Sequence, residues 1–579
     1  MGYLGTYQQW MNNTYFDEET KKELKLIEND IKEIEDRFYK DLEFGTGGLR
    51  GIIGAGTNRI NKYVIRKATQ GLANYISKHG KEAKEKGVVI AYDSRKYSDI
   101  FAEETTLVLN ANDIKTYLFD SLRPTPELSF AIREFGAIAG VVITASHNPS
   151  EYNGYKVYWE DGGQICPQIA NEITKEIEYI KDITKINVAD KEEAVKKGLY
   201  NIIGDEIDKK YIEKVVSLSL NPAKIQNCSN EFKIVYTPLH GTGNIPVRKA
   251  LEKAGFKNVF VVKEQENPDP EFPTVSVPNP EERDALNMAL DVAREKKADI
   301  VLGTDPDCDR VGVAVRHNGE YVLLSGNQIG ALLVDYICNS LKRQDKLPDN
   351  GVVIKTIVTS ELGQKIAADY GLGTINTLTG FKYIGEKIKE FEEAGDKQFI
   401  FGWEESYGYL TGTFVRDKDA VIASMLICEM AAYYYSKGMT LYDRLQELYE
   451  TYGFYKEELK SIKLTGSEGL KKIQKIMSFL RENPMKELCG LSVVKISDYY
   501  LRKSYDLINN TEEDLNLPKS NVLHFKLEDN SWFCIRPSGT EPKVKIYFSA
   551  AAKSEENAQE KVSCLVENVT GKINKIIAD

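Results

Sequence analysis

Three aspartates at alternate positions stand in the segment Asp305-Pro306-Asp307-Cys308-Asp309-Arg310. Carboxylates spaced in this way on an extended loop can converge on one cation. A set of ligands made only of oxygens and rich in carboxylates suits Mg²⁺. The alternative is a solvated turn, but three carboxylates directly after an apolar run (residues 300–302) favour a cation site.

Two other cation or phosphate motifs do not fit this segment. An EF-hand loop needs Gly at its sixth position and Glu at its twelfth, where this chain has Arg310 and Arg316. Phosphatases of the haloacid dehalogenase type carry D-x-D-x-[TV], but Asp309 fills the last place of that pattern.

A serine follows another apolar run, in Thr144-Ala145-Ser146-His147-Asn148-Pro149. A serine next to a histidine invites a hydrolase interpretation. However, the chain lacks a G-x-S-x-G elbow here, and sequence neighbours rarely have the geometry of a base and its nucleophile. The plain alternative is a helix cap made by Ser or Asn. From this loop alone, capping and catalysis are equally supported.

Two further loops carry polar groups that suit a sugar phosphate. Residues 402–408 offer carboxylates and a hydroxyl that would bind sugar hydroxyls, or that would begin a capped helix. Residues 536–543 offer an arginine, two hydroxyls and a glycine that exposes its backbone N–H, which together would make a phosphate cradle. A plain turn is the alternative for this second loop.

The elements that must position these loops read as repeated strand–loop–helix units. Short apolar runs at residues 88–91, 140–143, 300–302 and 399–401 each end in a polar loop, and helical patterns lie between them. Continuous apolar runs are typical of buried strands in α/β sheets, and such sheets bind ligands beyond the carboxyl ends of their strands. The sequence therefore predicts α/β units with the polar loops at their binding edge.

The last part of the chain differs in kind. A long helical stretch from Ala420 to about Arg481 predicts a domain end and a linker. Strands at residues 522–527, 532–535 and 544–548, with a helix from about Ser554, then predict a small α+β domain.

Composition limits the class of protein. A chain of 579 residues suggests about four domains. The net charge of −11 argues against nucleic acid or an anionic membrane as a partner. Eight scattered cysteines without a C-x-x-C pair, and five scattered histidines, argue against a zinc site or a disulfide framework and fit a reducing cytoplasm. The longest apolar stretch, residues 421–435, is interrupted by Glu429 and predicts a buried helix.

In this order and at this spacing, the four loops resemble the α-D-phosphohexomutase superfamily. The motifs are residues 144–149, 305–310, 404–406 and 536–540. Residues 152–164 and 44–51 are similar to the phosphoglucomutase/phosphopentomutase branch, bacterial-type α-phosphoglucomutases included. The resemblance covers nearly the whole chain.

The resemblance implies an α/β fold of three α/β domains plus a smaller C-terminal α+β domain around one cleft. The expected domains are 1–207 with the serine loop, 208–325 with the metal loop, 326–450 with the sugar loop, and 451–579 with the helical linker and phosphate loop.

Roles for individual residues follow from the same resemblance. Ser146 would be the phosphoserine, with Lys156, His147 and Arg50 as further catalytic residues and Lys156 as the general base. One Mg²⁺ per chain would be held by Ser146, Asp305, Asp307 and Asp309. The substrate-binding residues would be Arg310, Lys382, Glu404, Ser406, Lys418, Arg536, Ser538, Gly539 and Thr540, with the last four holding the phosphate that does not react.

The implied activity is an isomerase reaction on small sugar phosphates, without nucleic acid or membrane partners and in the cytoplasm. We expect interconversion of α-D-glucose 1-phosphate and D-glucose 6-phosphate, activated by glucose 1,6-bisphosphate. Mannose-type relatives place a histidine shortly after the Glu-x-Ser, where this chain has Tyr407-Gly408-Tyr409. Pentose and mannose phosphates stay open as alternative substrates. Two alternative functions also stay open: a phosphatase and, more remotely, a non-catalytic sugar-phosphate sensor. The second proton carrier and the oligomeric state are left undetermined.

Overall fold

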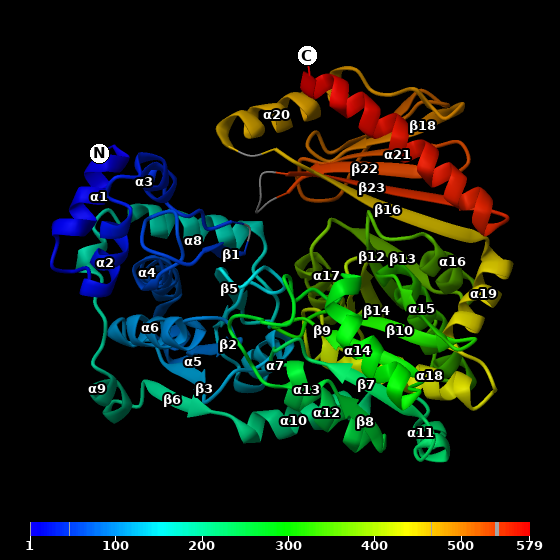
Figure 1. Cartoon of the computed structure of the whole chain (residues 1–579), viewed down its shortest axis with the longest axis horizontal. Coiled ribbons are helices and arrows are strands. Elements are labelled where there is room, and N and C mark those ends of the chain that lie inside the picture. The colour runs from blue at the N-terminus through cyan, green and yellow to red at the C-terminus, as the bar shows by residue number, and fades with distance from the viewer. Residues whose placement is uncertain (1, 46, 465, 539–542, 579) are drawn as a thin grey trace. The chain divides into compact units, whose positions relative to one another are not determined.

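The computed structural model describes residues 2–45, 47–464, 466–538 and 543–578, without the side chains of Gly466 and Ser467. Figure 1 shows its elements, with labels where there is room. Internal contacts divide the chain into two compact units, Met1–Val352 with Gly380–Leu441, and Val353–Thr379 with Tyr442–Asp579. Each unit contains a hydrophobic core of its own.

Three short helices open the first unit. They are α1 (Tyr3–Asn12), α2 (Glu18–Leu26) and α3 (Ile31–Phe38). Asp17 and Asp30 cap α2 and α3, each accepting a backbone N–H from the first turn. The helices pack around Trp10, whose ring stacks on Phe16.

The first sheet has six strands in the order β1-β5-β4-β2-β3-β6. The strands are β1 (Gly48–Ile52), β2 (Val88–Tyr92), β3 (Thr116–Phe119), β4 (Ala139–Ile143), β5 (Tyr152–Trp159) and β6 (Tyr200–Ile203). The helices of this part are α4 (Lys62–Lys78), α5 (Gly80–Lys86), α6 (Ser98–Ala111), α7 (Thr125–Phe135), α8 (Pro167–Tyr179), η1 (Ile183–Lys185) and α9 (Lys191–Lys196). β2, β3, β4 and β6 run parallel, whereas β5 is antiparallel to β4 and β1. The buried apolar strands β2 and β4 confirm the prediction from their sequences.

The second sheet has five strands in the order β11-β10-β9-β7-β8. The strands are β7 (Lys233–Thr237), β8 (Asn258–Val261), β9 (Ile300–Thr304), β10 (Val311–His317) and β11 (Glu320–Leu324). The helices are α10 (Asp205–Ser217), α11 (Pro222–Cys228), α12 (Asn244–Ala254), α13 (Lys263–Glu266) and α14 (Arg283–Lys296). β9 and β10 are antiparallel, with Thr304 opposite Val311. The three aspartates therefore lie in the turn of a hairpin.

The rest of the first unit centres on one buried helix. Its elements are α15 (Gly326–Arg343), α17 (Phe381–Ala394), β14 (Gln398–Glu404), β15 (Gly408–Leu410) and α18 (Ala420–Tyr435). α18 is apolar and buried on all sides, as its sequence predicts. In the part of the chain that the structure describes, no helix combines the length and apolar character needed to span a bilayer.

The second unit is built on an eight-stranded sheet that contains β16 (Phe454–Lys463), β17 (Glu487–Leu488), β18 (Leu491–Asp498), β19 (Lys503–Asp506), β20 (Thr511–Asp514), β21 (Leu523–Leu527), β22 (Trp532–Pro537) and β23 (Lys543–Ala552). Its other elements are β12 (Gly351–Thr356, whose first two residues belong to the first unit), α16 (Leu362–Asp369), β13 (Gly373–Thr377), α19 (Leu441–Tyr452), α20 (Gly466–Glu482) and α21 (Glu555–Ala578). α21 packs along β16 and β23 (Figure 1). The predicted C-terminal strands and helix are confirmed.

Three sequence predictions need correction. The expected helical linker after Ala420 is interrupted by the ten-residue strand β16, which pairs along its length with β23. The expected loop at residues 402–408 is neither a free loop nor a helix start, because Glu404 ends β14 and pairs with Gly408 of β15. Cys489 and Cys564, 75 residues apart, form a disulfide, whereas the sequence predicted none.

Candidate functional site

The serine loop begins where β4 ends. Ser146 is buried and has φ of +53°, in the left-handed region that non-glycine residues rarely adopt. Its backbone N–H donates to Thr144 Oγ1 (2.8 Å), and the Thr144 hydroxyl donates to Asp93 Oδ2 (2.6 Å). The strained backbone therefore aims one hydroxyl out of a loop that is fixed by hydrogen bonds.

Arg95 fixes the same loop through hydrogen bonds to its backbone. Its guanidinium donates to four backbone carbonyl oxygens, those of Ser146, Asn148, Pro149 and Tyr152. Arg95 Nε lies 3.3 Å from Asp93 Oδ2, and both side chains are fully buried. From the sequence, residues 93–95 were predicted only to lie in the polar loop after a strand. The role of Arg95 could not be predicted, because a side chain that binds backbone carbonyls leaves no pattern in the residue types of the segment it binds.

The metal loop forms the turn between β9 and β10. Carboxylate oxygens of Asp305, Asp307 and Asp309 lie within 4.8 Å of one another, and all three residues are buried. Asp305 Oδ1 accepts the backbone N–H groups of Asp309 and Arg310. The loop folds tightly enough for its alternate carboxylates to converge, as the sequence predicts.

Two oxygens of this cluster lack hydrogen-bond donors. Among the described residues, none donates to Asp307 Oδ1 or Asp309 Oδ1, although both atoms are buried. Buried carboxylate oxygens without donors are costly unless a cation satisfies them. The donor set therefore fits a hard divalent cation such as Mg²⁺.

The serine loop and the metal loop meet. Ser146 Oγ donates to Asp305 Oδ2 at 2.8 Å, and His147 Nδ1 lies 3.3 Å from the same hydroxyl. Arg50, on β1, donates to Asn148 Oδ1 in the serine loop. The nucleophile predicted from sequence thus contacts one of the predicted metal ligands, Asp305.

Two lysines face the carboxylates. Lys156, on β5, lies 2.7 Å from Asp307 Oδ2 and 3.6 Å from Asp309 Oδ2. Lys418 lies 3.2 Å from Asp309 Oδ2. Gly408 makes room for Lys418, because a Cβ there would lie 2.2 Å from Lys418 Cδ.

Burial and neighbouring charges shift the pKa values of Asp305 and Asp307 in opposite directions. Burial, with Asp307 and Asp309 nearby, raises the pKa of Asp305 well above its usual range. Burial also acts to raise the pKa of Asp307, but the positive charge and hydrogen bond of Lys156 outweigh it and lower that pKa. Asp307 is therefore held in its charged form more firmly than Asp305.

The hairpin that carries Glu404 is joined to the metal loop, since Val311 N–H donates to Tyr407 O. Glu404 Oε1 accepts the backbone N–H of Gly380 (2.8 Å), and Ser406 is half-buried in the turn. Burial raises the pKa of Glu404 to about 7, against the opposing charge of Lys418.

Arg310 and Lys382 complete the predicted side chains of the first unit. Arg310 forms an ion pair with Glu281 and lies 3.8 Å from Asp309 Oδ1. Lys382 lies in the first turn of α17, two residues after Gly380. Burial lowers the pKa of Lys382.

Four domain descriptions of one family match the chain. Those of the α/β/α domains I, II and III of phosphoglucomutase/phosphomannomutase match residues 41–184, 209–319 and 325–452, and that of its C-terminal domain matches residues 465–563. A phosphoglucomutase of Staphylococcus aureus is 37% identical over 543 residues, or 93% of this chain and 95% of that protein. One of Staphylococcus haemolyticus is 37% identical over 516 residues, or 89% and 91% of the two chains.

This chain belongs to the phosphoglucomutase/phosphomannomutase family. It is an enzyme of the phosphohexomutase type, an isomerase, with three α/β domains and a C-terminal domain.

Solved structures share the fold of this family. Parafusin of Paramecium, described as a phosphoglucomutase in an open form, superposes with a TM-score of 0.68 at 19% identity, covering 93% of this chain and 95% of that chain. A phosphoglucomutase/phosphomannomutase family protein of Burkholderia thailandensis gives 0.64 at 16% identity, covering 92% and 97%. At these identities the likeness shows the fold alone.

The predicted phosphate loop of this phosphohexomutase lies in the second unit. Arg536 is half-buried at the end of β22, with Nη2 donating to Tyr547 Oη (3.2 Å), and Ser538 N–H donates to Lys543 O (2.8 Å). Gly539 and Thr540 lie outside the described residues.

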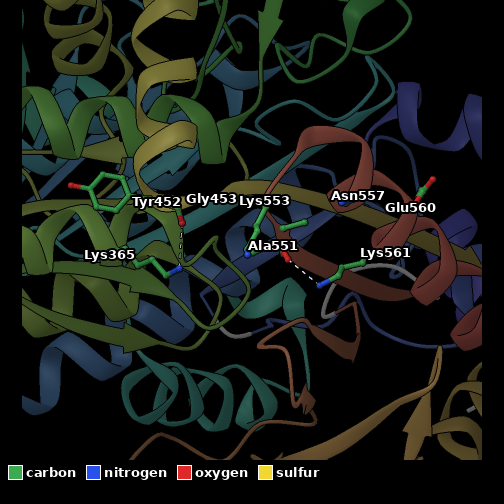
Figure 2. A pocket seen from close by; sticks show the side chains of 9 residues that line it. Lys365, Tyr452, Gly453, Ala551, Lys553, Asn557, Glu560 and Lys561 are labelled. Carbon is green, nitrogen blue, oxygen red and sulfur yellow. Dashed lines mark hydrogen bonds between the residues drawn. The ribbon is translucent and has the colours of Figure 1, made fainter.

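A depression of about 600 Å³ also lies in the second unit (Figure 2). Lysines 365, 553 and 561 line it, and Lys561 Nζ donates to Ala551 O. Of the described residues that line this depression, none is a site residue predicted from the sequence.

Proposed function

We propose that this enzyme interconverts α-D-glucose 1-phosphate and D-glucose 6-phosphate, with Ser146 carrying the phosphoryl group. The observation that carries the proposal is the Ser146 hydroxyl, 2.8 Å from Asp305 Oδ2 inside a group of three buried carboxylates. The choice of glucose is supported by the 37% identity to phosphoglucomutases.

The reaction runs in two transfers. Phosphorylated Ser146 gives its phosphoryl group to the free hydroxyl of the sugar monophosphate, so the P–O bond to Oγ breaks as a P–O bond to the sugar forms. The resulting glucose 1,6-bisphosphate turns around, and the Ser146 hydroxyl takes the other phosphoryl group. We assign the hydroxyl protons to Lys156, with His147 and Arg50 as further catalytic residues. Glucose 1,6-bisphosphate from solution would phosphorylate Ser146 and so act as activator.

One Mg²⁺ per chain is proposed, held by Asp305, Asp307, Asp309 and Ser146. The two carboxylate oxygens without donors support this set. When bound, the cation cancels negative charge on the oxygens of the phosphoryl group. Ser146 and the positive side chains Lys156 and Arg310 then keep the phosphoryl group in line.

Substrate recognition is assigned to the remaining predicted residues. Glu404 would accept hydrogen bonds from sugar hydroxyls, and Ser406 would donate hydrogen bonds to them. The charged groups of the substrate would be bound by Lys382, Lys418 and Arg310. The phosphate that does not react is assigned to Arg536, Ser538, Gly539 and Thr540, because arginine and exposed N–H groups suit phosphate.

We further propose the domain boundaries 1–207, 208–325, 326–450 and 451–579, and a cytoplasmic location. Six free cysteines, five of them buried, support the location, and the Cys489–Cys564 disulfide stands against it. Thiol counting on protein trapped directly from cells would decide the point, since two missing thiols contradict a reducing compartment.

A panel of substrates tests the proposed reaction. Glucose 1-phosphate, mannose 1-phosphate, ribose 1-phosphate and deoxyribose 1-phosphate are assayed side by side with Mg²⁺ and the matching bisphosphate. We expect the largest kcat/KM for glucose 1-phosphate and no release of free phosphate. A much larger kcat/KM for a pentose phosphate would make the enzyme a phosphopentomutase. Phosphate release without isomerisation would overturn the mutase mechanism.

A further inference from the structure

Thr125 joins the serine-bearing part of the first unit to the metal loop. It is the first residue of α7 and is fully buried. Its backbone N–H donates to Asp307 O (2.9 Å), and its hydroxyl donates to Asp307 Oδ2 (2.9 Å), across 182 residues of sequence. One residue therefore binds both the backbone and the carboxylate of the central aspartate.

The segment before Thr125 is itself anchored. Arg123 N–H donates to Tyr92 O at the end of β2, and the Arg123 side chain donates to Asp208 (2.8 Å) and Asp120 (3.0 Å). Pro124 then fixes the entry into the helix. The Thr125 hydroxyl is thus presented from a rigid position rather than from a mobile loop.

The donors on Asp307 are distributed unevenly between its two oxygens. Oδ2 accepts both the Thr125 hydroxyl and Lys156 Nζ (2.7 Å). Oδ1 is buried, and no described residue donates to it. Two donors on Oδ2 restrain rotation of the carboxylate, and they leave Oδ1, the oxygen without a donor, as the atom available to a cation.

We infer that Thr125 is a positioning residue for the divalent cation: its hydroxyl fixes the Asp307 carboxylate so that Oδ1 is the ligand. In this role Thr125 acts through Asp307 and is not itself a ligand of the cation. The inference rests on the proposed function, in which the three aspartates hold Mg²⁺. A role limited to starting α7 would need the backbone N–H alone, which Thr125→Val and Thr125→Ser both keep.

The test measures Mg²⁺ binding by titration calorimetry on the full chain without substrate. Thr125→Val keeps the shape and the backbone N–H but removes the hydroxyl, and Thr125→Ser restores a donor. Thr106→Val is the matched control, because Thr106 is equally buried and donates only to Ala102 O in its own helix. We expect T125V to raise the Kd for Mg²⁺ about tenfold, with T125S and T106V close to wild type. Melting in EDTA shows whether each variant is folded.

The outcomes separate this inference from the metal site itself. An unchanged Kd in folded T125V overturns the role of Thr125, provided that Asp307→Asn abolishes binding. If D307N binds Mg²⁺ like wild type, the proposed metal site is wrong and this inference is lost with it. Should T125V fail to fold, Thr125→Cys, with its weaker donor, is judged by the same criterion.

Discussion

The Ser146 hydroxyl donates to Asp305 Oδ2 at 2.8 Å, although 159 residues separate the two in sequence. The contact links the loop after β4 to the loop after β9 within one unit. The pKa of Asp305 is raised by burial and by its two neighbouring carboxylates. A phosphoryl group on Ser146 would replace this hydrogen bond, so the two residues cannot keep the same contact throughout a catalytic cycle.

Removing the nucleophile should stop the mutase reaction without unfolding the chain. Ser146→Ala is expected to lower kcat by at least about 10³-fold, because no other group can hold the phosphoryl group between the two transfers. Intact-mass measurement after incubation with glucose 1,6-bisphosphate should show one added phosphoryl group on wild type and none on S146A. The exposed Ser121→Ala is the control. An S146A enzyme within tenfold of wild type would falsify the assignment.

Asp307→Asn should cost activity far more than stability. The carboxylate is held charged by Lys156, and the substitution keeps its size while removing the charge that a cation needs. We expect a loss of at least about 10²-fold in kcat/KM and no calorimetric Mg²⁺ binding. Asp335→Asn, a buried aspartate on α15, is the comparison for a general loss of charge. The metal role is wrong if exhaustive chelation leaves the wild-type rate unchanged.

The two central loops could be located from the sequence alone. Residues 144–149 and 305–310 directly follow the buried strands β4 and β9, whose continuous apolar runs are easy to recognise, and ligands bind beyond the carboxyl ends of such strands. Their polar residue types then indicate the chemistry. The serine loop alone supports capping and catalysis equally, and β4 and β9 lie in different sheets. The prediction that Ser146 and the aspartates belong to one site therefore came from the resemblance to the α-D-phosphohexomutase superfamily.

Other features could not be predicted for physical reasons. β16 lies at the end of its sheet, and edge strands often carry charges that discourage further pairing, so its Lys- and Glu-rich sequence resembles an exposed helix. Arg95 binds backbone carbonyls, and Thr125 finds its partner 182 residues away. Neither contact creates a local pattern. The Cys489–Cys564 pair has the same difficulty, because spacing alone does not fix which cysteines meet.

Glu404 should impose a pH dependence on substrate binding. Burial raises its pKa to about 7, so the carboxylate that would accept hydrogen bonds from the sugar becomes neutral as the pH falls through about 7. We expect the KM of wild type to rise on acidification. Glu404→Gln should have a KM about tenfold higher at pH 8, with only the substrate's own phosphate titration left in its profile. Identical pH profiles for KM in the two enzymes would contradict this role.

The raised pKa of Glu404 also makes the free energy of unfolding depend on pH in a predictable direction. Because the folded-state pKa lies above the ordinary value of 4.5, the folded protein binds this proton more tightly than the unfolded chain does. The stabilisation that this proton on Glu404 gives to the folded state is complete below about pH 4.5 and is lost as the pH rises through about 7. Relative to wild type, E404Q should therefore gain stability between pH 5 and pH 8, as followed by denaturant unfolding without Mg²⁺.

Arg95 should control the rate through the serine loop rather than through substrate affinity. Arg95→Lys keeps a charge beside Asp93 but cannot supply the planar set of donors that binds the carbonyls of Ser146, Asn148, Pro149 and Tyr152. The left-handed backbone at Ser146 would lose part of its support. We expect kcat to fall at least about tenfold, KM to change by less than about threefold, and the free energy of unfolding to drop by about 2–4 kcal/mol. Arg133→Lys is the control, because Arg133 donates to the backbone carbonyl of Asp161, away from the serine loop, and should leave kcat within about twofold. Loss of stability in R95K with a wild-type kcat would show that Arg95 supports the fold and does not set the geometry of Ser146.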